Sequence, residues 1–190
     1  NYIVTVTDNA GCVVTSSNNI TSPTAITIQT VSQQNVKCFG NNTGNINIAA
    51  SGGTGTLSYL WSNGNTTSSV TSLTMGNYSV TVTDQNNCTK QQSFTITQPA
   101  SALSSSTTPV GTTCELNNGA ALVVPAGGTT PYKFLWSNGS NSAQINNLAS
   151  GNYTVIVSDF YNCSLTQSAI ILPSTAVTIQ STQQANVDCN

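Results

Sequence analysis

The chain has 190 residues and only 4% of them are charged, against about 25% in an average soluble domain. Three lysines, no arginine and a net charge of −2 provide no basic surface for nucleic acid or an anionic membrane. No apolar run approaches the ~20 residues needed to span a bilayer, and the first residues do not resemble a signal peptide. We therefore expect no nucleic-acid partner and no membrane span in this stretch, with any targeting signal lying outside it.

Internal repetition is the strongest feature of the sequence. The segment Asn-Tyr-Ile-Val-Thr-Val-Thr-Asp at residues 1–8 returns in related form at 77–84 and 152–159, a period of about 75 residues. A Gly-Gly-Thr turn followed by Trp-Ser-Asn-Gly occurs at 52–64 and again at 127–139. The repeats and their Pro-containing junctions predict four parts: 1–24, the end of a preceding repeat; 25–99 and 100–173, two complete repeats; and 174–190, the start of a following repeat.

Apolar residues alternate with polar ones within each repeat, which is typical of half-buried strands. Tyr78, Val80 and Val82 share one face of a predicted strand. In chain order, the strands of the first complete repeat are expected at Ile26 and Ile28, Ile46 and Ile48, the segment ending at Trp61, Val70 to Leu73, Tyr78 to Asp84, and Phe94 and Ile96. No segment has helical periodicity. The pattern predicts an all-β chain of tandem immunoglobulin-like β-sandwich repeats of about 75 residues.

Four aromatic residues support the immunoglobulin-like plan. Trp61 and Trp136 fall in the third strand of each repeat, where such domains bury a tryptophan. Tyr78 and Tyr153 follow Gly-Asn at the start of a late strand and are expected to form tyrosine corners. We favour core packing over ligand stacking for the tryptophans, because an alternating apolar face flanks each of them.

Six cysteines occur in a chain without histidine, and none belongs to a closely spaced zinc-binding pair. A repeat of ~75 residues buries little more than 60% of its unfolded surface, so a supplement such as a disulfide is expected. The structural disulfide candidates are Cys12, Cys38, Cys88, Cys114, Cys163 and Cys189. They indicate an oxidising compartment.

Three regular pairing schemes are compatible with the repeat. One joins sequence neighbours, as in Cys12 with Cys38, and one joins the two cysteines of a repeat, as in Cys38 with Cys88. The third joins successive repeats, Cys38 with Cys163, and leaves the others for partners outside the chain. We favour the third, because the predicted topology places Cys38 and Cys88 at opposite poles, ~17 to 20 Å apart, whereas disulfide Cα atoms lie within ~7 Å. The other two schemes remain open.

The acidic residues do not form a catalytic or metal-binding set. Asp8, Asp84 and Asp159 occupy one position of the repeat, just before a turn, where capping of the turn is favoured over calcium binding. The other acids are Glu115 and Asp188. With no histidine or arginine, we expect no catalytic residue, no cofactor, no metal and no enzymatic activity.

Successive motifs of the chain resemble the SprB repeat. These are Val36-Lys37-Cys38-Phe39-Gly40, Gly-Gly-Thr, Trp-Ser-Asn-Gly, Gly-Asn-Tyr-x-Val and Thr-Asp-x-x-x-Cys. The resemblance extends over the whole chain, with a departure at residues 112–116, where no glycine follows the cysteine. It implies a very large, secreted cell-surface adhesin of Bacteroidota, exported by the type IX route, like the adhesin of gliding cells.

The expected function is that of a non-enzymatic structural region, a stalk or an extracellular filament, at the cell surface. Its expected partners are neighbouring repeats and further copies of itself, because a surface with few charges lacks like-charge repulsion. The alternative is an array of carbohydrate-binding modules that recognise surface polysaccharide. For that role only Phe39, Phe160 and Tyr161 are predicted to be aromatic residues in loops. An ice-binding surface is less favoured, because the outward Thr rows are short.

Overall fold

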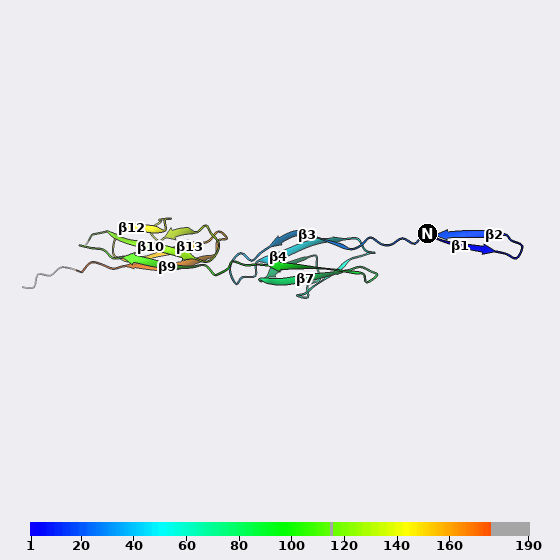
Figure 1. Cartoon of the computed structure of the whole chain (residues 1–190). Coiled ribbons are helices and arrows are strands. Elements are labelled where there is room, and N and C mark those ends of the chain that lie inside the picture. Colours follow the sequence, from blue (N-terminus) through cyan, green and yellow to red (C-terminus); the bar gives the residue numbers. More distant parts are fainter. Residues whose placement is uncertain (115, 176–190) are drawn as a thin grey trace, which may run out of the picture. The chain divides into compact units, whose positions relative to one another are not determined.

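A computed structural model describes residues 1–114 and 116–175 of the chain (Figure 1). These residues form two compact units. The first comprises Asn1–Asn35 and Asn42–Thr97, and the second comprises Val36–Asn41 and the described residues from Gln98 onward. In the described ranges, no helix has the length and apolar character needed to cross a membrane.

Both units consist of antiparallel strands joined by short turns. The first unit contains β1 (Tyr2–Thr7), β2 (Val13–Asn18), β3 (Thr27–Gln34), β4 (Gly44–Ser51), β5 (Ser58–Trp61), β6 (Ser69–Leu73), β7 (Gly76–Thr83) and β8 (Thr89–Ile96). The second contains β9 (Ser104–Val110), β10 (Gly119–Ala126), β11 (Lys133–Trp136), β12 (Gln144–Leu148), β13 (Gly151–Ser158) and β14 (Ser164–Ile171). The strands from β10 to β14 each begin 75 residues after their counterparts from β4 to β8, so the two units repeat one plan.

Each six-stranded set forms a sandwich of two three-stranded sheets. In the first unit the sheets have the orders β3-β4-β6 and β5-β7-β8, and in the second β9-β10-β12 and β11-β13-β14. Taken in chain order as A, B, C, E, F and G, the strands give an ABE sheet and a CFG sheet, which is the immunoglobulin plan without strand D. The prediction of tandem immunoglobulin-like β-sandwiches is confirmed.

The core of each sandwich follows from the alternation in its strands. In β7, Val80 and Val82 are fully buried, and the tyrosine-corner hydroxyl of Tyr78 donates to the carbonyl of Thr74 at 3.1 Å. Trp61 at the end of β5 is 2% exposed and packs against Phe94 of β8, with ring centroids 5.6 Å apart. Burial of these large apolar side chains provides the main driving force for folding.

The second sandwich has its core at the same positions, with the same tryptophan and valines but with Ala169 in place of Phe94. Trp136 of β11 is buried among Val155, Val157 and other apolar residues, and its indole N–H donates to the carbonyl of Ser142. The hydroxyl of Tyr153 donates to the carbonyl of Ala149 at 3.3 Å, which forms the second tyrosine corner. The two tryptophans therefore lie in the cores, and the two tyrosines form tyrosine corners.

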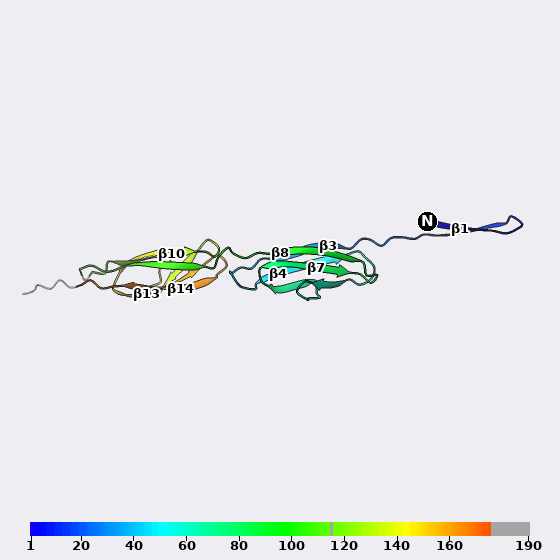
Figure 2. The same cartoon turned by 60° about the horizontal axis from the view of Figure 1, so that its bottom comes forward.

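The two sheets of each sandwich meet along the edge where the first and last strands lie side by side, β3 with β8 (Figure 2). The side-chain amide of Gln33 donates to the carbonyl of Thr95 at 2.7 Å across this edge. In the second sandwich the donor lies in the last strand instead, where the side-chain amide of Gln167 donates to the carbonyl of Ser105, also at 2.7 Å. An uncharged amide therefore bridges the first and last strands of each sandwich.

The hairpin formed by β1 and β2 has the register of the β7–β8 hairpin. Tyr2 pairs with Asn18 as Tyr78 pairs with Phe94. All residues of β1 and β2 are nevertheless exposed. The face that carries Val80 and Val82 in the first sandwich is therefore uncovered in this hairpin.

Candidate functional site

A disulfide between Cys38 and Cys163 is the main candidate site. The sulfurs are 2.00 Å apart, the Cα atoms 5.8 Å apart, and the two residues are separated by 125 positions in the chain. Cys38 lies in the loop between β3 and β4, and Cys163 lies in the turn between β13 and β14. Because Val36–Asn41 belongs to the second unit, both sulfurs lie within that unit. We call Cys38 and its equivalent Cys114 the loop cysteines, and Cys12, Cys88 and Cys163 the turn cysteines.

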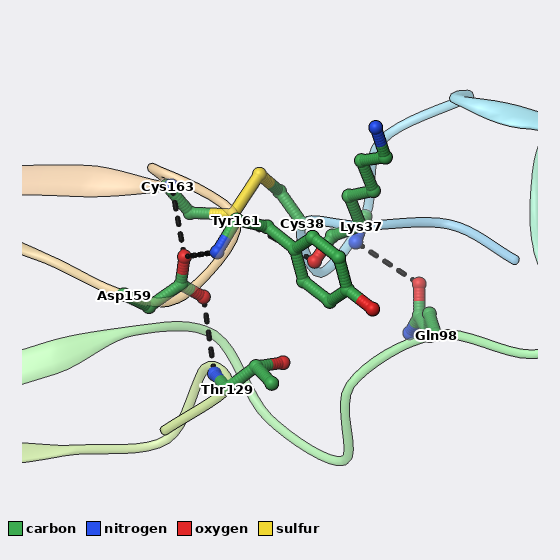
Figure 3. Close-up of a disulfide and its surroundings, with 8 residues drawn as sticks. Lys37, Cys38, Gln98, Thr129, Asp159, Tyr161 and Cys163 are labelled. Atoms are coloured by element: carbon green, nitrogen blue, oxygen red, sulfur yellow. Dashed lines mark hydrogen bonds between the residues drawn. A yellow bond between two sulfur atoms is a disulfide. The ribbon is translucent and has the colours of Figure 1, made fainter. Parts of the chain in front are cut away.

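A buried carboxylate holds the turn that carries Cys163 (Figure 3). Asp159 Oδ1 accepts hydrogen bonds from the backbone N–H groups of Tyr161 and Cys163, both at 2.9 Å. Its Oδ2 accepts a third bond, of 3.0 Å, from the N–H of Thr129 in the Gly-Gly-Thr turn. Asp159 is 0% exposed, so these bonds replace the water that the carboxylate loses on burial.

The loop that carries Cys38 is fastened on its other side. The side-chain oxygen of Gln98 accepts a bond of 3.0 Å from the N–H of Gly40 (Figure 3). The N–H of Asn41 donates to the carbonyl of Cys38, also at 3.0 Å. Gly40 has a left-handed φ of 76°, which favours glycine. Val36, two residues before the cysteine, is only 3% exposed. The loop is therefore anchored by a buried side chain and by hydrogen bonds.

The first sandwich contains the same carboxylate turn without a disulfide. Asp84 Oδ1 accepts bonds from the N–H groups of Asn86 and Cys88, and its Oδ2 accepts one from Thr54. Burial raises the pKa of Asp84, but the backbone hydrogen bonds from Thr54, Cys88 and Asn86 lower it, and the net result is a pKa below the ordinary value. The ionised carboxylate is thus the form that the fold stabilises.

Asp8 caps the turn of the β1–β2 hairpin with bonds from Ala10 and Cys12, both at 2.9 Å. The structure thus places all three repeated aspartates as turn caps. The sequence did not predict that the Gly-Gly-Thr turn donates a hydrogen bond to Asp84 in the first sandwich and to Asp159 in the second. The recurrence of Gly-Gly-Thr with each complete repeat was the available signal, but nothing in the sequence linked it to the aspartate 30 residues later.

Three of the remaining cysteines have no disulfide partner within the described part of the chain. Cys12, Cys88 and Cys114 are exposed free thiols, while Cys189 lies outside the described residues. Cys114 has a left-handed φ of 50°, whereas Cys38 is not among the residues with positive φ. The departure from the repeat motif at residues 112–116 therefore changes the backbone of this loop.

The acidic side chains do not assemble a metal site within residues 1–114 and 116–175, where no three of the Cys, Asp and Glu side chains come together. The two remaining acids, Glu115 and Asp188, lie outside those ranges. Chemically, the arrangement formed by Asp159 and the disulfide can hold backbone segments together.

An open concavity occurs on the outer face of β11 and β13, with a volume of about 510 Å³. Tyr132, Phe134, Leu135 and Ile156 supply apolar surface, and Lys133 contributes an exposed cation. The counterparts of Lys133 and Ile156 in the first sandwich are Ser58 and Thr81, 75 residues earlier. The equivalent position of the first sandwich therefore lacks this cation and this aliphatic side chain. The loop aromatics proposed for the carbohydrate role, Phe39, Phe160 and Tyr161, are 45%, 56% and 42% exposed.

The fold defines a protein of tandem immunoglobulin-like β-sandwiches, with a disulfide between Cys38 and Cys163. The family model "SprB repeat" matches residues 30–66 and 104–141, which extend from β3 and β9 into the turns after β5 and β11. Two segments of the chain therefore match the SprB repeat. SprB repeats occur in cell-surface proteins.

Three solved structures are similar to the chain in part. They are DIP-gamma IG1+IG2 (10% identity, TM-score 0.37), murine CEACAM1b (14%, 0.32) and Dpr11 IG1 bound to DIP-gamma IG+IG2 (11%, 0.33). Each similarity covers 78% of this chain, and 98%, 100% and 100% of those chains in the same order. No match was found among curated proteins.

Proposed function

We propose that the chain is a non-enzymatic structural repeat region, a stalk or filament, of a large secreted cell-surface adhesin. The observation that supports this most directly is the Cys38–Cys163 disulfide, which links one repeat of the sequence to the next. A covalent bond between segments 125 positions apart resists their separation under load. We further propose that the repeats extend over residues 25–99 and 100–173, with 1–24 and 174–190 belonging to adjoining repeats.

The composition supports an extracellular role. Disulfides persist in oxidising compartments and are rare in the cytosol. The surface contains few charged groups, and Ser, Thr, Asn and Gln make the contacts that ion pairs make elsewhere. The source proposed from the SprB repeat is a member of the Bacteroidota.

The function is tested on cells that produce the protein. Intact cells are treated with a membrane-impermeant thiol reagent, and the protein is then recovered and mapped by mass spectrometry. We expect modification of the exposed thiol of Cys114 without lysis, with Cys38 and Cys163 protected. Modification only after lysis would contradict a surface location. Stretching single molecules then tests the structural role, since a stalk should unfold in repeat-sized steps at forces that fall after reduction.

Saccharide binding is the second candidate function, and the concavity over β11 and β13 favours it. Aromatic and aliphatic side chains beside one lysine and the polar side chains of Asn141 and Ser158 suit a sugar ring with an acidic substituent. Titration calorimetry with neutral and uronic-acid oligosaccharides tests it. Lys133→Ala should weaken binding of the acidic sugar, and Ser58→Ala, at the equivalent site of the first sandwich, should not. Absence of heat with both sugar classes would exclude this candidate.

A further inference from the structure

The turn around each turn cysteine has the same backbone whether or not the cysteine is bonded. The N–H of the cysteine donates to Oδ1 of the aspartate four residues earlier, at 2.8 Å for Cys88 and 2.9 Å for Cys163. The N–H of that aspartate donates back to the cysteine carbonyl at 3.0 Å in both turns. The residue before the cysteine is left-handed in both, with φ of 60° at Asn87 and 62° at Asn162. Cys88 is therefore held in the backbone conformation of the bonded Cys163.

Cys88 differs from Cys163 in having an exposed free thiol. The carboxylate beneath it, Asp84, makes all three backbone bonds that Asp159 makes, including the bond from the Gly-Gly-Thr turn. No rearrangement of this turn is thus required before a partner thiol can react, and preorganisation of this kind lowers the cost of association.

The β1–β2 hairpin provides an independent indication of the partner. Tyr2, Val4 and Val6 occupy the positions of Tyr78, Val80 and Val82, yet they are 66%, 61% and 59% exposed, whereas Val80 and Val82 are fully buried. Asp8 makes two of the three bonds of Asp84, and the missing bond is the one from a Gly-Gly-Thr turn. The hairpin thus presents the face that the other strands of an SprB-type repeat cover.

The spacing of the cysteines indicates which cysteine of that repeat would pair with Cys88. In the first complete repeat the loop cysteine, Cys38, lies 50 residues before the turn cysteine, Cys88, and in the second the separation is 49. A repeat completed around β1 and β2 would carry a loop cysteine at this spacing before Cys12. Its separation from Cys88 would be within one residue or so of the 125 positions between Cys38 and Cys163.

We propose that Cys88 is the turn half of a second inter-repeat disulfide, whose other half is the loop cysteine of an SprB-type repeat that includes the β1–β2 hairpin. The inference rests on the proposed function, since the partner is a repeat of the same structural array. Cys114 is not assigned in the same way, because the backbone of its loop differs from that of Cys38.

The bond forms by oxidation of two thiols. Cys88 and the partner cysteine each lose a proton, and together they transfer two electrons to a small-molecule disulfide such as oxidised glutathione, which is reduced to two thiols. The sulfur–sulfur bond of the oxidant breaks as the new bond forms. Exposure of the Cys88 thiol provides the access that this exchange requires.

The test extends the chain by a second copy of residues 25–76 placed directly before Asn1, which supplies the strands from β3 to β6 and completes the hairpin. The extended and original chains are folded in a glutathione redox buffer, alkylated without reduction and mapped by mass spectrometry. We expect Cys88 to be alkylated in the original chain and to be found in a disulfide with the added Cys38 in the extended chain. Cys12 is the matched control, because its turn is the same and no repeat precedes the completed one, so it should remain alkylated.

Changing the added Cys38→Ser should restore alkylation of Cys88. Hydrogen exchange of β1 and β2 reports whether the added strands have folded onto the hairpin. If they have not, a chain with a second copy of residues 25–99 in place of residues 1–24 provides the same loop cysteine in a complete sandwich, and the same Cys88 bond is expected. Alkylated Cys88 in a folded extended chain, or a bond from the added Cys38 to Cys12, would overturn the inference. Neither result would alter the outcome of surface labelling on cells, which tests the proposed function.

Discussion

The backbone N–H of Thr54 donates a hydrogen bond of 2.8 Å to Oδ2 of Asp84, 30 residues later in the chain. Thr129 and Asp159 make the same contact at 3.0 Å in the second sandwich. One buried carboxylate therefore fastens the Gly-Gly-Thr turn to the turn that carries a cysteine. Since a buried carboxylate is stable only when its oxygens are satisfied, these contacts should control the backbone geometry of the two turns in each sandwich.

Acid should destabilise the first sandwich through Asp84. Its pKa is lower in the folded chain than the ordinary 3.8, so its stabilising contribution is complete above that value and is lost as the pH falls through it toward the lower folded pKa. We expect unfolding temperatures measured by calorimetry to stay level from pH 7 to about pH 5 and to fall below about pH 4. Asp84→Asn should be less stable at pH 7 and should flatten this acid dependence. An unchanged acid dependence in this variant would contradict the assignment.

The second glycine of the Gly-Gly-Thr turn should be sensitive to substitution for two reasons. Gly128 has a φ of 60°, and a Cβ there would lie 2.8 Å from Asp159 Oδ2. Gly139 has a φ of 84° with nothing within 4 Å of such a Cβ, so it isolates the backbone strain. Urea unfolding should show a loss of about 1 to 2 kcal/mol for Gly139→Ala. It should show a further ~1 to 3 kcal/mol for Gly128→Ala. Equal losses would show that the carboxylate contact is unimportant.

The buried tryptophan of the second sandwich should be essential for its stability. Trp136→Ala removes a 2% exposed side chain and should lower the free energy of unfolding by ~3 to 5 kcal/mol. Its neighbour Leu135 is 52% exposed, so Leu135→Ala should change that free energy by no more than about 0.5 kcal/mol. Denaturant titration followed by circular dichroism measures both. A small loss for Trp136→Ala would contradict the assigned core.

Removal of the disulfide should destabilise the second unit. The bond closes a long loop of 125 positions, and a native disulfide contributes roughly 2 to 4 kcal/mol. Cys163→Ser should therefore lower the free energy of unfolding by about that amount, with a similar loss for Cys38→Ser. Cys88→Ser is the matched control and should have little effect, because Cys88 is a free thiol in the same kind of turn. In both variants, hydrogen exchange should show reduced protection of β13 and β14, next to the lost bond.

Self-association is expected from the low charge and from the uncovered face of the hairpin. Sedimentation should show concentration-dependent assemblies that depend weakly on salt, because few charged groups are present to be screened. Val4→Lys with Val6→Lys should reduce assembly, since both side chains are exposed and lie on the uncovered face. Thr5→Lys, on the opposite face of β1, is the control for added charge. A monodisperse monomer at high concentration would contradict the prediction.

Local pattern determined a large part of this fold. Alternation in Tyr78, Val80 and Val82 predicted a strand with one buried side, and the structure buries Val80 and Val82 completely. The third-strand tryptophans and the Gly-Asn-Tyr motifs indicated the sandwich type, because each needs only its own strand and the adjacent turn. Such features repeat with the sequence period, so they could be recognised without knowledge of how distant segments meet.

Tertiary structure decided which distant groups come together. The sequence favoured Cys38 with Cys163 but left two other schemes open, and the structure contains that bond. It also places Val36–Asn41 in the second unit and joins Thr54 to Asp84. The physical reason is that a disulfide or a carboxylate contact depends on the three-dimensional path of the chain between its partners, whereas the period of side-chain burial depends only on neighbouring residues of a strand.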